Sequence, residues 1–149
     1  MDKMDRKILQ VLQANARASL QDIGQAVGLS PSPCWSRIRK MEEAGVIEGY
    51  TVRLNAQALD LGDTVLVQVT LDSHSDNTLE KFGEILANIP EVIEAYLVSG
   101  EYDYLLRVAV RDTRDYERLL RERLYRIKGI RHSKSSFVLR TLKKADLPL

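Results

Sequence analysis

The sequence predicts an α+β protein, with an N-terminal helix-turn-helix and a C-terminal ferredoxin-like βαββαβ unit. Two observations lead to this fold class. Before residue 46, apolar residues recur every three or four positions, which is the period of one helix face. From residue 65 onward, alternating runs rich in Val and Leu are separated by two further helical patterns, in the order strand, helix, strand, strand, helix, strand.

The first two helices are predicted by apolar spacing and by start signals. The first is expected over residues 4–14, with an apolar stripe of Met4, Ile8, Val11 and Leu12. Ser19 and Asp22 form a capping-box pattern, in which each side chain accepts a backbone N–H of the other residue, and this pattern starts the second helix. Gly24 lies inside that helix, so we expect a neighbouring helix to approach closely there.

Residues 30–47 are the most informative segment, because one helix with two different faces is signalled there. Ser30 suits the N-cap, Pro31 suits the first helical position, and Gly45 suits the end, where positive φ is common. The face expected to be buried carries Cys34, Ile38 and Met41. We interpret Cys34 as a small buried hydrophobic residue rather than a redox switch.

The opposite face of this third helix suits the major groove of DNA. From Ser30 to Met41 there are three cations and no acid. Serine hydroxyls suit phosphates, and Arg39 is best placed to reach a base edge. Trp35 fits packing and DNA contact equally well, and a three-helix packing module without DNA is the plain alternative. The candidate DNA-binding residues are Ser30, Ser32, Trp35, Ser36, Arg37, Arg39 and Lys40.

The middle of the chain is expected to connect two domains. Residues 46–55 have strand character with a break at Gly49, and we interpret them as a short wing or linking strand. Residues 56–63 are typical of a hinge. The predicted organisation is a DNA-binding domain over 1–50, a linking strand and hinge over 51–63, and a second domain over 64–149.

The second domain is predicted element by element from its changes of period. A helix ending at Pro90 carries Leu79, Phe82, Leu86 and Ile89 on one face. A second helix is capped by Asp112 or Thr113 and closed by Gly129. Its charged run over 114–126 alternates in sign, which is typical of a solvated helix face rather than a second nucleic-acid site. Strands are expected over 65–71, 92–98, 104–110 and 135–142.

Composition excludes several other classes of protein. The chain has 149 residues, a net charge of +1 and a single cysteine, so no internal disulfide forms and a cytoplasmic location fits. We find neither an apolar run long enough to span a membrane nor a secretory signal. His74 and His132 are the only histidines and form no recognisable metal set. No metal or cofactor is expected.

Two separate groups of motifs resemble one family over essentially the whole chain. The matching segments are 5–9 (DRKIL), 27–34 (VGLSPSPC), 37–47 (RIRKMEEAGVI), 49–50 (GY) and 97–106 (LVSGEYDYLL). With these the chain resembles the leucine-responsive regulatory protein/AsnC (Lrp/AsnC) family of transcription regulators. The resemblance implies a winged helix-turn-helix and a ferredoxin-like RAM domain. It also implies homodimers that assemble into a homo-octamer, double-stranded DNA as partner, and a free amino acid or similar small molecule bound between C-terminal domains.

The turn over 99–103 is the strongest candidate for the effector site. Its backbone N–H groups suit a carboxylate, and Asp103 suits an α-ammonium group. The alternative is a plain strand connection in which Asp103 caps its own backbone. The resemblance adds positions outside the turn, and members of the family often have a bulkier residue where this chain has Ser136. The candidate residues are Leu97, Ser99, Gly100, Tyr102, Asp103, Thr113, Ser136, Phe137 and Val138.

The sequence therefore predicts a sequence-specific regulator of amino-acid metabolism that is not an enzyme. One alternative is a haem-synthesis-type decarboxylase of the same build, but two isolated histidines and the lack of a catalytic constellation argue against it. The other alternative is an architectural DNA-binding protein without a ligand. A net charge of +1 argues against a purely electrostatic compactor of DNA.

Overall fold

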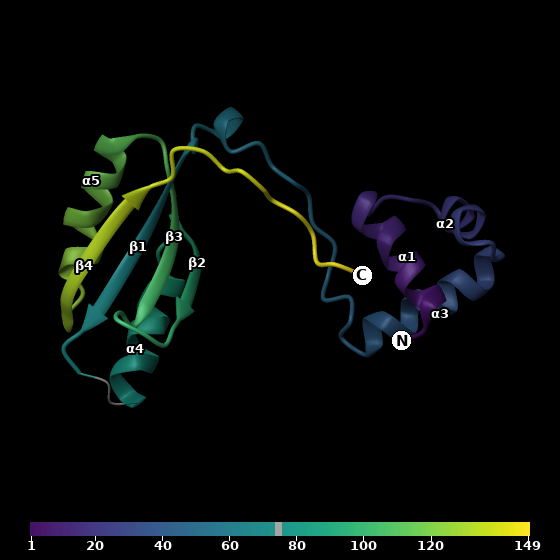
Figure 1. The fold of residues 1–149 in the computed structure, drawn as a ribbon, viewed down its shortest axis with the longest axis horizontal. Helices are drawn as coiled ribbons and strands as arrows, with labels where there is room; N and C mark the ends of the chain where they lie inside the picture. Colours follow the sequence, from purple (N-terminus) through teal and green to yellow (C-terminus); the bar gives the residue numbers. More distant parts are fainter. Residues whose placement is uncertain (74–75) are drawn as a thin grey trace. The chain divides into compact units, whose positions relative to one another are not determined.

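A computed structural model describes residues 1–73 and 76–149 of the chain (Figure 1). Its contacts divide the chain into two compact units, one of Met1–Arg53 with Lys143–Leu149 and one of Leu54–Leu142. We call them the helical unit and the sheet unit. Residues 143–149 were predicted as part of the second domain, and their contacts are with the helical unit.

Three helices form the helical unit, as predicted: α1 (Lys3–Ala14), α2 (Leu20–Val27) and α3 (Pro31–Glu43). The predicted capping box at Ser19 and Asp22 is confirmed, and α1 begins with a second capping box made by Asp2 and Asp5. The buried core between the helices consists of Ile8, Leu9, Leu12, Ile23, Val27, Cys34, Ile38 and Met41. The predicted burial of Cys34 is therefore confirmed, with 0% of the residue exposed.

The start of α3 differs from the prediction, although Ser30 does occupy the N-cap position. Its backbone is extended, but its side chain makes no capping hydrogen bond. The reason is local chemistry. The first and third helical positions are Pro31 and Pro33, which have no N–H, so one of the two donors that an N-cap oxygen normally uses is missing.

The end of α3 confirms the prediction for Gly45. Its φ is 68°, and the backbone N–H of Val46 donates to the Met41 carbonyl at 2.8 Å. The Gly45 N–H donates to the Glu42 carbonyl at 3.0 Å. These two bonds make a Schellman motif, which satisfies carbonyls that the helix leaves unpaired at its end.

Gly24 is needed for a close approach, but the neighbour is not a helix. A Cβ at this position would lie 2.4 Å from the carbonyl oxygen of Leu29, in the turn before α3. The Leu29 N–H in turn donates to the Gly24 carbonyl at 2.9 Å. The expectation of close approach is confirmed, and its assignment to a neighbouring helix was wrong.

The strand predicted over 46–55 is absent, since these residues form neither a helix nor a hydrogen-bonded ladder. A strand needs a partner for its backbone groups, and the described residues pair no other strand with this segment. Val52 and Leu54, which carried the strand pattern, are 71% and 70% exposed. After them comes only a short 3-10 turn, η1 (Gln57–Leu59).

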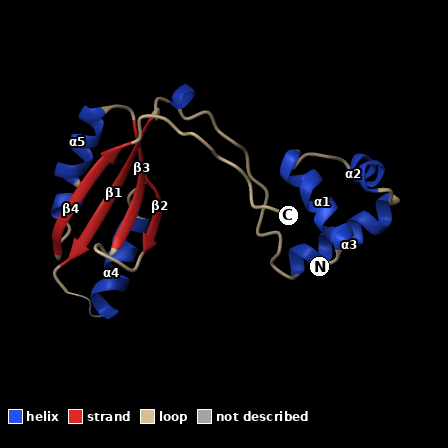
Figure 2. Cartoon of the chain, in the orientation of Figure 1, coloured by secondary structure: helices blue, strands red, loops and turns tan. Residues whose placement is uncertain are grey.

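The sheet unit confirms the predicted βαββαβ order (Figure 2). Its strands lie in the order β2-β3-β1-β4 and every neighbouring pair is antiparallel. Both helices pack on one face, over a core that includes Val67, Phe82, Leu106 and Leu119. The elements are β1 (Asp63–Leu71), α4 (Asp76–Ala87), β2 (Val92–Leu97), β3 (Tyr104–Val110), α5 (Thr113–Glu122), η2 (Leu124–Arg126) and β4 (Ile130–Phe137).

Two boundaries near the C-terminus differ from the sequence prediction. Helix α5 ends at Glu122 and is followed by η2, and β4 begins at Ile130 rather than at residue 135. The register of the sheet explains the early start, because Leu71 at the end of β1 pairs with Ile130. Since β4 is an edge strand, it tolerates polar residues whose pattern alone does not indicate a strand.

Candidate DNA and effector sites

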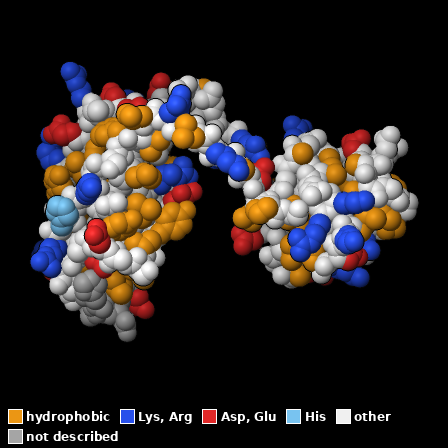
Figure 3. All heavy atoms as spheres, viewed as in Figure 1, with side chains coloured by type: hydrophobic (Ala, Val, Ile, Leu, Met, Phe, Trp, Pro, Cys, Tyr) orange, Lys and Arg blue, Asp and Glu red, His pale blue; other side chains and the backbone are white. Residues whose placement is uncertain are grey.

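The outer face of α3 is exposed, as the DNA hypothesis requires. Cys34, Ile38 and Met41 are buried in the helical core, so the residues between them point away from it. Figure 3 shows Lys and Arg side chains on the viewed side of the helical unit. Six of the seven candidate DNA-binding residues are exposed: Ser30, Ser32, Trp35, Ser36, Arg39 and Lys40.

Arg39 lies in a row of three side chains along this outer face. Its guanidinium carbon is 5.8 Å from the centre of the Trp35 ring, and Nη2 lies 3.4 Å from Glu43 Oε1. Trp35 is 55% exposed, which fits both half-buried packing and contact with DNA. The Arg39 guanidinium therefore contacts the Trp35 ring and forms an ion pair with Glu43.

Arg37 occupies a different environment from the other cations of α3. Its Nη1 lies 2.7 Å from Asp2 Oδ2 and 2.7 Å from Asp5 Oδ1, the two residues that cap α1. The Asp5 N–H and then the Arg37 guanidinium lower the pKa of the Asp2 carboxyl to about 2. Arg37 therefore joins the start of α1 to the middle of α3. The sequence placed Arg37 among the candidate DNA-binding residues, and periodicity does not reveal its partners in another helix.

Sequence reasoning also missed a contact that fixes the chain after α3. The Tyr50 hydroxyl donates to Glu42 Oε1 at 2.9 Å. Burial and then the neighbouring Glu42 carboxylate raise the pKa of Tyr50. The contact holds the segment leaving the helix against the last turn of α3.

The turn over 99–103 is tied to the end of β1 by Asp103. One carboxylate oxygen of Asp103 accepts the Leu71 N–H at 2.7 Å, and the Asp103 N–H donates to the Val69 carbonyl at 2.9 Å. Gly100 has a φ of 136°, which other residues rarely adopt. Among the described residues, the Asp103 carboxylate therefore bonds to the backbone of β1 and not to the backbone of its own turn.

The nine candidate effector residues fall into two groups at opposite ends of the sheet. Asp103 lies beside Leu71, whereas Ser136 pairs with Leu66, and five residues of strand span about 16 Å. Thr113 begins α5 just after β3, at the Ser136 end. One group contains Leu97, Ser99, Gly100, Tyr102 and Asp103, and the other contains Thr113, Ser136, Phe137 and Val138.

Phe137 has a packing role within the second group. Its ring meets that of Tyr116 in α5 edge to face, with centroids 5.4 Å apart. The Tyr116 hydroxyl and Ser135 Oγ are hydrogen-bonded at 2.6 Å. Burial raises the pKa of Tyr116. This end of β4 is therefore fastened to α5, while the Ser136 side chain lies on the opposite face of the sheet.

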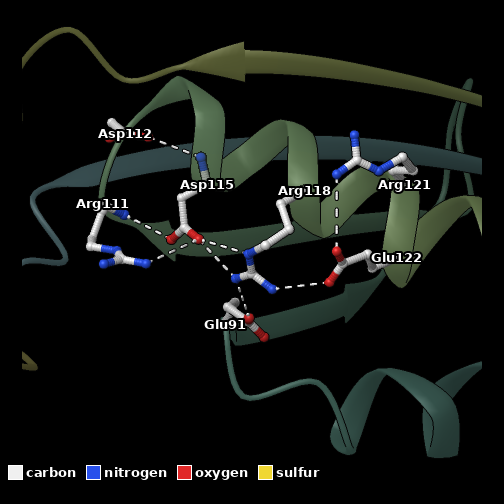
Figure 4. A network of polar contacts seen from close by, with 7 residues as sticks. All are labelled: Glu91, Arg111, Asp112, Asp115, Arg118, Arg121 and Glu122. Atoms are coloured by element: carbon white, nitrogen blue, oxygen red, sulfur yellow. Dashed lines mark hydrogen bonds and ion pairs between the residues drawn. The ribbon is translucent and has the colours of Figure 1, made fainter.

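The charged run of α5 is a network of ion pairs, as the sequence predicted (Figure 4). Arg118 contacts Asp115 at 2.8 Å, Glu91 at 3.2 Å and Glu122 at 3.4 Å. The Asp112 side chain caps the helix by accepting the Asp115 N–H. Arg118 and Arg121 of this run are engaged with neighbouring acids, which supports a solvated helix face.

A cleft of about 1040 Å³ lies between α4 and the segment after α5. Phe82, Ile89 and Ile127 line its floor, and Lys81 and Arg126 lie at its rim. The lining contains none of the nine candidate effector residues, and no sequence pattern pointed to it.

The described residues contain no metal-binding group. Within residues 1–73 and 76–149, no three His, Cys, Asp or Glu side chains are placed to hold an ion. His132 lies exposed on β4, and His74 is outside the described residues. None of the described helices has the length and apolar character needed to cross a membrane.

Comparisons with known proteins assign both halves of the chain. Residues 1–48 match the family of winged helix-turn-helix DNA-binding domains, and residues 64–148 match the Lrp/AsnC ligand binding domain. The leucine-responsive regulatory protein of Escherichia coli K12 is 38% identical over 146 residues, covering 98% of this chain and 89% of the relative. The protein of that name from Klebsiella pneumoniae gives the same figures.

Solved structures agree over almost the whole chain. An AsnC family transcriptional regulator from Agrobacterium tumefaciens has a TM-score of 0.95 and 40% identity, covering 99% of this chain and 97% of the other. A Neisseria meningitidis transcriptional regulator in complex with L-methionine has a TM-score of 0.94 and 34% identity, covering 99% of this chain and 96% of the other. The feast or famine regulatory protein of M. tuberculosis, also complexed with L-methionine, has a TM-score of 0.84 and 30% identity, covering 99% of this chain and 97% of the other.

Proposed function

The chain belongs to the Lrp/AsnC family of DNA-binding transcription regulators, and on that basis we propose that it controls genes of amino-acid metabolism in response to a free amino acid. It would do so in the cytoplasm, at specific double-stranded DNA sites. The relatives named above are regulators, and we propose no reaction for this chain.

The observation that carries the DNA-binding part is the outer face of α3. Arg39 is exposed there, yet it is oriented by the Trp35 ring and the Glu43 carboxylate. A planar guanidinium held in a defined direction suits the paired acceptors on the edge of guanine. Ser32, Ser36 and Lys40 surround it with groups that suit phosphates. Arg37 would act indirectly, by keeping α1 and α3 in place.

The effector part is supported by the separation of the candidate residues within one chain. Asp103 and Ser136 lie at opposite ends of one sheet, so a small amino acid cannot contact both in the same copy. We therefore place the effector between two copies, with the 99–103 turn of one facing the 136–138 segment of another. Asp103 would hold the α-ammonium group in addition to its bond with Leu71.

Assembly follows from the sheet unit. Both helices cover one face of the sheet, and Figure 3 shows hydrophobic side chains on the opposite face. Tyr96 and Leu105 are paired on that face, with Tyr96 50% exposed. We propose that two copies pair through these faces and that the homodimers assemble further into a homo-octamer. A two-fold dimer presents two copies of α3, which predicts a near-palindromic DNA site.

The proposed mechanism is a shift between assemblies. The amino acid binds one packing of dimers better than another, and this changes how the paired α3 helices are presented to DNA. The change in DNA affinity cannot exceed the difference in effector affinity between the two arrangements.

A thermal-shift screen against the twenty free amino acids, followed by DNA binding with and without each hit, tests the proposal. L-methionine is the first probe, because two similar regulators have been solved with it bound. A ligand of the native state must raise the melting temperature, and the same ligand is expected to change DNA affinity. No stabilisation by any of the twenty, together with unchanged DNA affinity, would favour an architectural protein instead.

Complementation tests the position between copies. Asp103→Ala and a Ser136→Phe variant are each expected to abolish the response of a pure assembly to the effector. If the site is built from two copies, assemblies mixed from both variants contain some intact sites and recover part of the response. A site within one copy gives no recovery.

A further inference from the structure

The last seven residues, Lys143–Leu149, belong to the helical unit although they follow β4 in the chain. We call this segment the C-terminal strap. Leu149 is partly buried and packs against the helical core, whereas Leu147 is 80% exposed. The Gln13 side chain donates to the Leu147 carbonyl at 3.2 Å, and the Gln10 side chain donates to the Leu149 carbonyl at 3.4 Å. One face of α1 therefore receives the strap.

A fourth contact joins the strap to the end of the helical unit. Asp146 forms an ion pair with Arg53, the last residue of Met1–Arg53. Each of these contacts is weak by itself, because the polar groups are exposed and only one side chain is partly buried. They act together because the strap is tethered. A short tether raises the effective concentration of a segment to roughly the millimolar range, at which weak docking is populated.

The strap changes how the DNA-binding unit is connected. Without docking, only residues 54–62 link the helical unit to the sheet. With docking, residues 138–142 form a second connection, which starts where β4 ends at Phe137. A second connection reduces the orientational freedom of the helical unit. Part of the orientational entropy is therefore already lost before DNA binds, which lowers the cost of fitting two copies of α3 to one DNA site.

We propose that the C-terminal strap couples the end of β4 to the DNA-binding unit, so that its docking on α1 preorganises paired α3 helices for a two-half-site DNA. This inference rests on the proposed function, because the second connection begins beside Ser136, Phe137 and Val138, where we place part of the effector site. An effector bound there shifts the docking equilibrium of the strap, and docking shifts effector affinity by the same factor.

The test compares Leu149→Ser with Leu147→Ser, a matched change at the exposed leucine two residues away. The DNA probes are a two-half-site duplex selected by the wild-type protein from a random pool, and the single half-site cut from it. Leu149→Ser, and equally a chain ending at residue 142, is expected to bind the two-half-site duplex about three- to tenfold more weakly, with half-site binding unchanged. Leu147→Ser should match the wild type on both duplexes.

Equal weakening on both duplexes would show that Leu149 only supports the folding of the helical unit, and would overturn the proposal. Unchanged two-half-site binding would overturn it as well.

A second readout needs neither DNA nor effector. Trp35 is the only tryptophan and lies on α3, so the decay of its fluorescence anisotropy reports the motion of the helical unit. Leu149→Ser should shorten the slow decay and Leu147→Ser should not. If the wild type selects no DNA at all, the proposed function fails and this readout alone decides about the strap. Identical decays in all three proteins would overturn the strap proposal.

Discussion

The carboxylate of Asp103 accepts the backbone N–H of Leu71 at 2.7 Å, so the turn before β3 is fastened to the end of β1. The bond is partly buried and charge-assisted, which makes it stronger than an ordinary surface hydrogen bond. Asp103→Asn keeps an acceptor but removes the charge. We expect the free energy of unfolding to fall by about 1–2 kcal/mol in urea titrations.

The control for Asp103 is Glu101→Gln, which makes the same chemical change at an exposed position of the same turn. It should leave the urea midpoint unchanged. If both variants behave alike, the bond to Leu71 does not contribute to stability.

Arg37 and Arg39 are two residues apart on α3, and we expect opposite phenotypes from them. Arg39→Ala should weaken binding to the selected DNA by about 5- to 150-fold, the range for one lost base contact. Its unfolding free energy should change by less than about 0.5 kcal/mol, because its pair with Glu43 is exposed. Arg37→Ala should lower stability, because Asp2 and Asp5 lose their partner. DNA titration and urea unfolding of both variants separate the two roles.

The contact between Arg37 and Asp2 gives a prediction about the pH dependence of stability. The folded-state pKa of Asp2 is about 2, below its ordinary value of 3.8. A group whose pKa is lower in the folded state stabilises the protein above its unfolded pKa, and this stability is lost as the pH falls toward the folded pKa. Stability should therefore fall between pH 4 and pH 2.

Arg37→Met removes one cause of the lowered Asp2 pKa. The urea midpoint of this variant should therefore depend less steeply on pH in this range than that of the wild type. Arg39→Met is the control and should keep the wild-type slope. Asp22 and Asp115 also have lowered pKa values, but both variants keep them. Parallel pH profiles for the two variants would contradict a role of Arg37 at Asp2.

Gly24 and Gly83 should respond in opposite directions to alanine. A Cβ at Gly24 would lie 2.4 Å from the Leu29 carbonyl oxygen, whereas one at Gly83, inside α4, would meet nothing within 4 Å. Gly24→Ala should destabilise the protein by about 1–3 kcal/mol through overpacking. Gly83→Ala should stabilise it by roughly 0.5–1 kcal/mol, because alanine favours the helix. Thermal unfolding of each variant checks this, and stabilisation by Gly24→Ala would disprove the close contact.

Elements with their own local signals were predictable. Helix α2 begins at the Ser19–Asp22 capping box and α3 ends just before Gly45, and both signals involve residues within one turn of each other. Strands β1 and β3 were predictable because they lie inside the sheet, where alternating burial leaves a regular apolar pattern. The start of β4 was missed, because an edge strand is selected by the register of its neighbour rather than by its own apolar residues.

For the sites, the sequence identified which face of α3 is exposed but not which of its cations is available. Arg37 and Arg39 have the same chemistry and similar positions on the helix. Only the arrangement of α1 against α3 brings Asp2 and Asp5 to Arg37. The docking of Leu149 on the helical unit is of the same kind, because it joins residues more than a hundred positions apart.

By itself, the sequence determined the two-part α+β organisation, the capping box of α2, and the buried face and end signal of α3, because these follow from periodicity and from contacts between near neighbours in the chain. The tertiary structure alone decided which ion pairs form and where β4 begins. It also placed the candidate effector residues at opposite ends of the sheet and brought residues 143–149 into contact with α1. Those features depend on contacts between segments that are far apart in the sequence, and the local spacing of residues does not reveal such contacts.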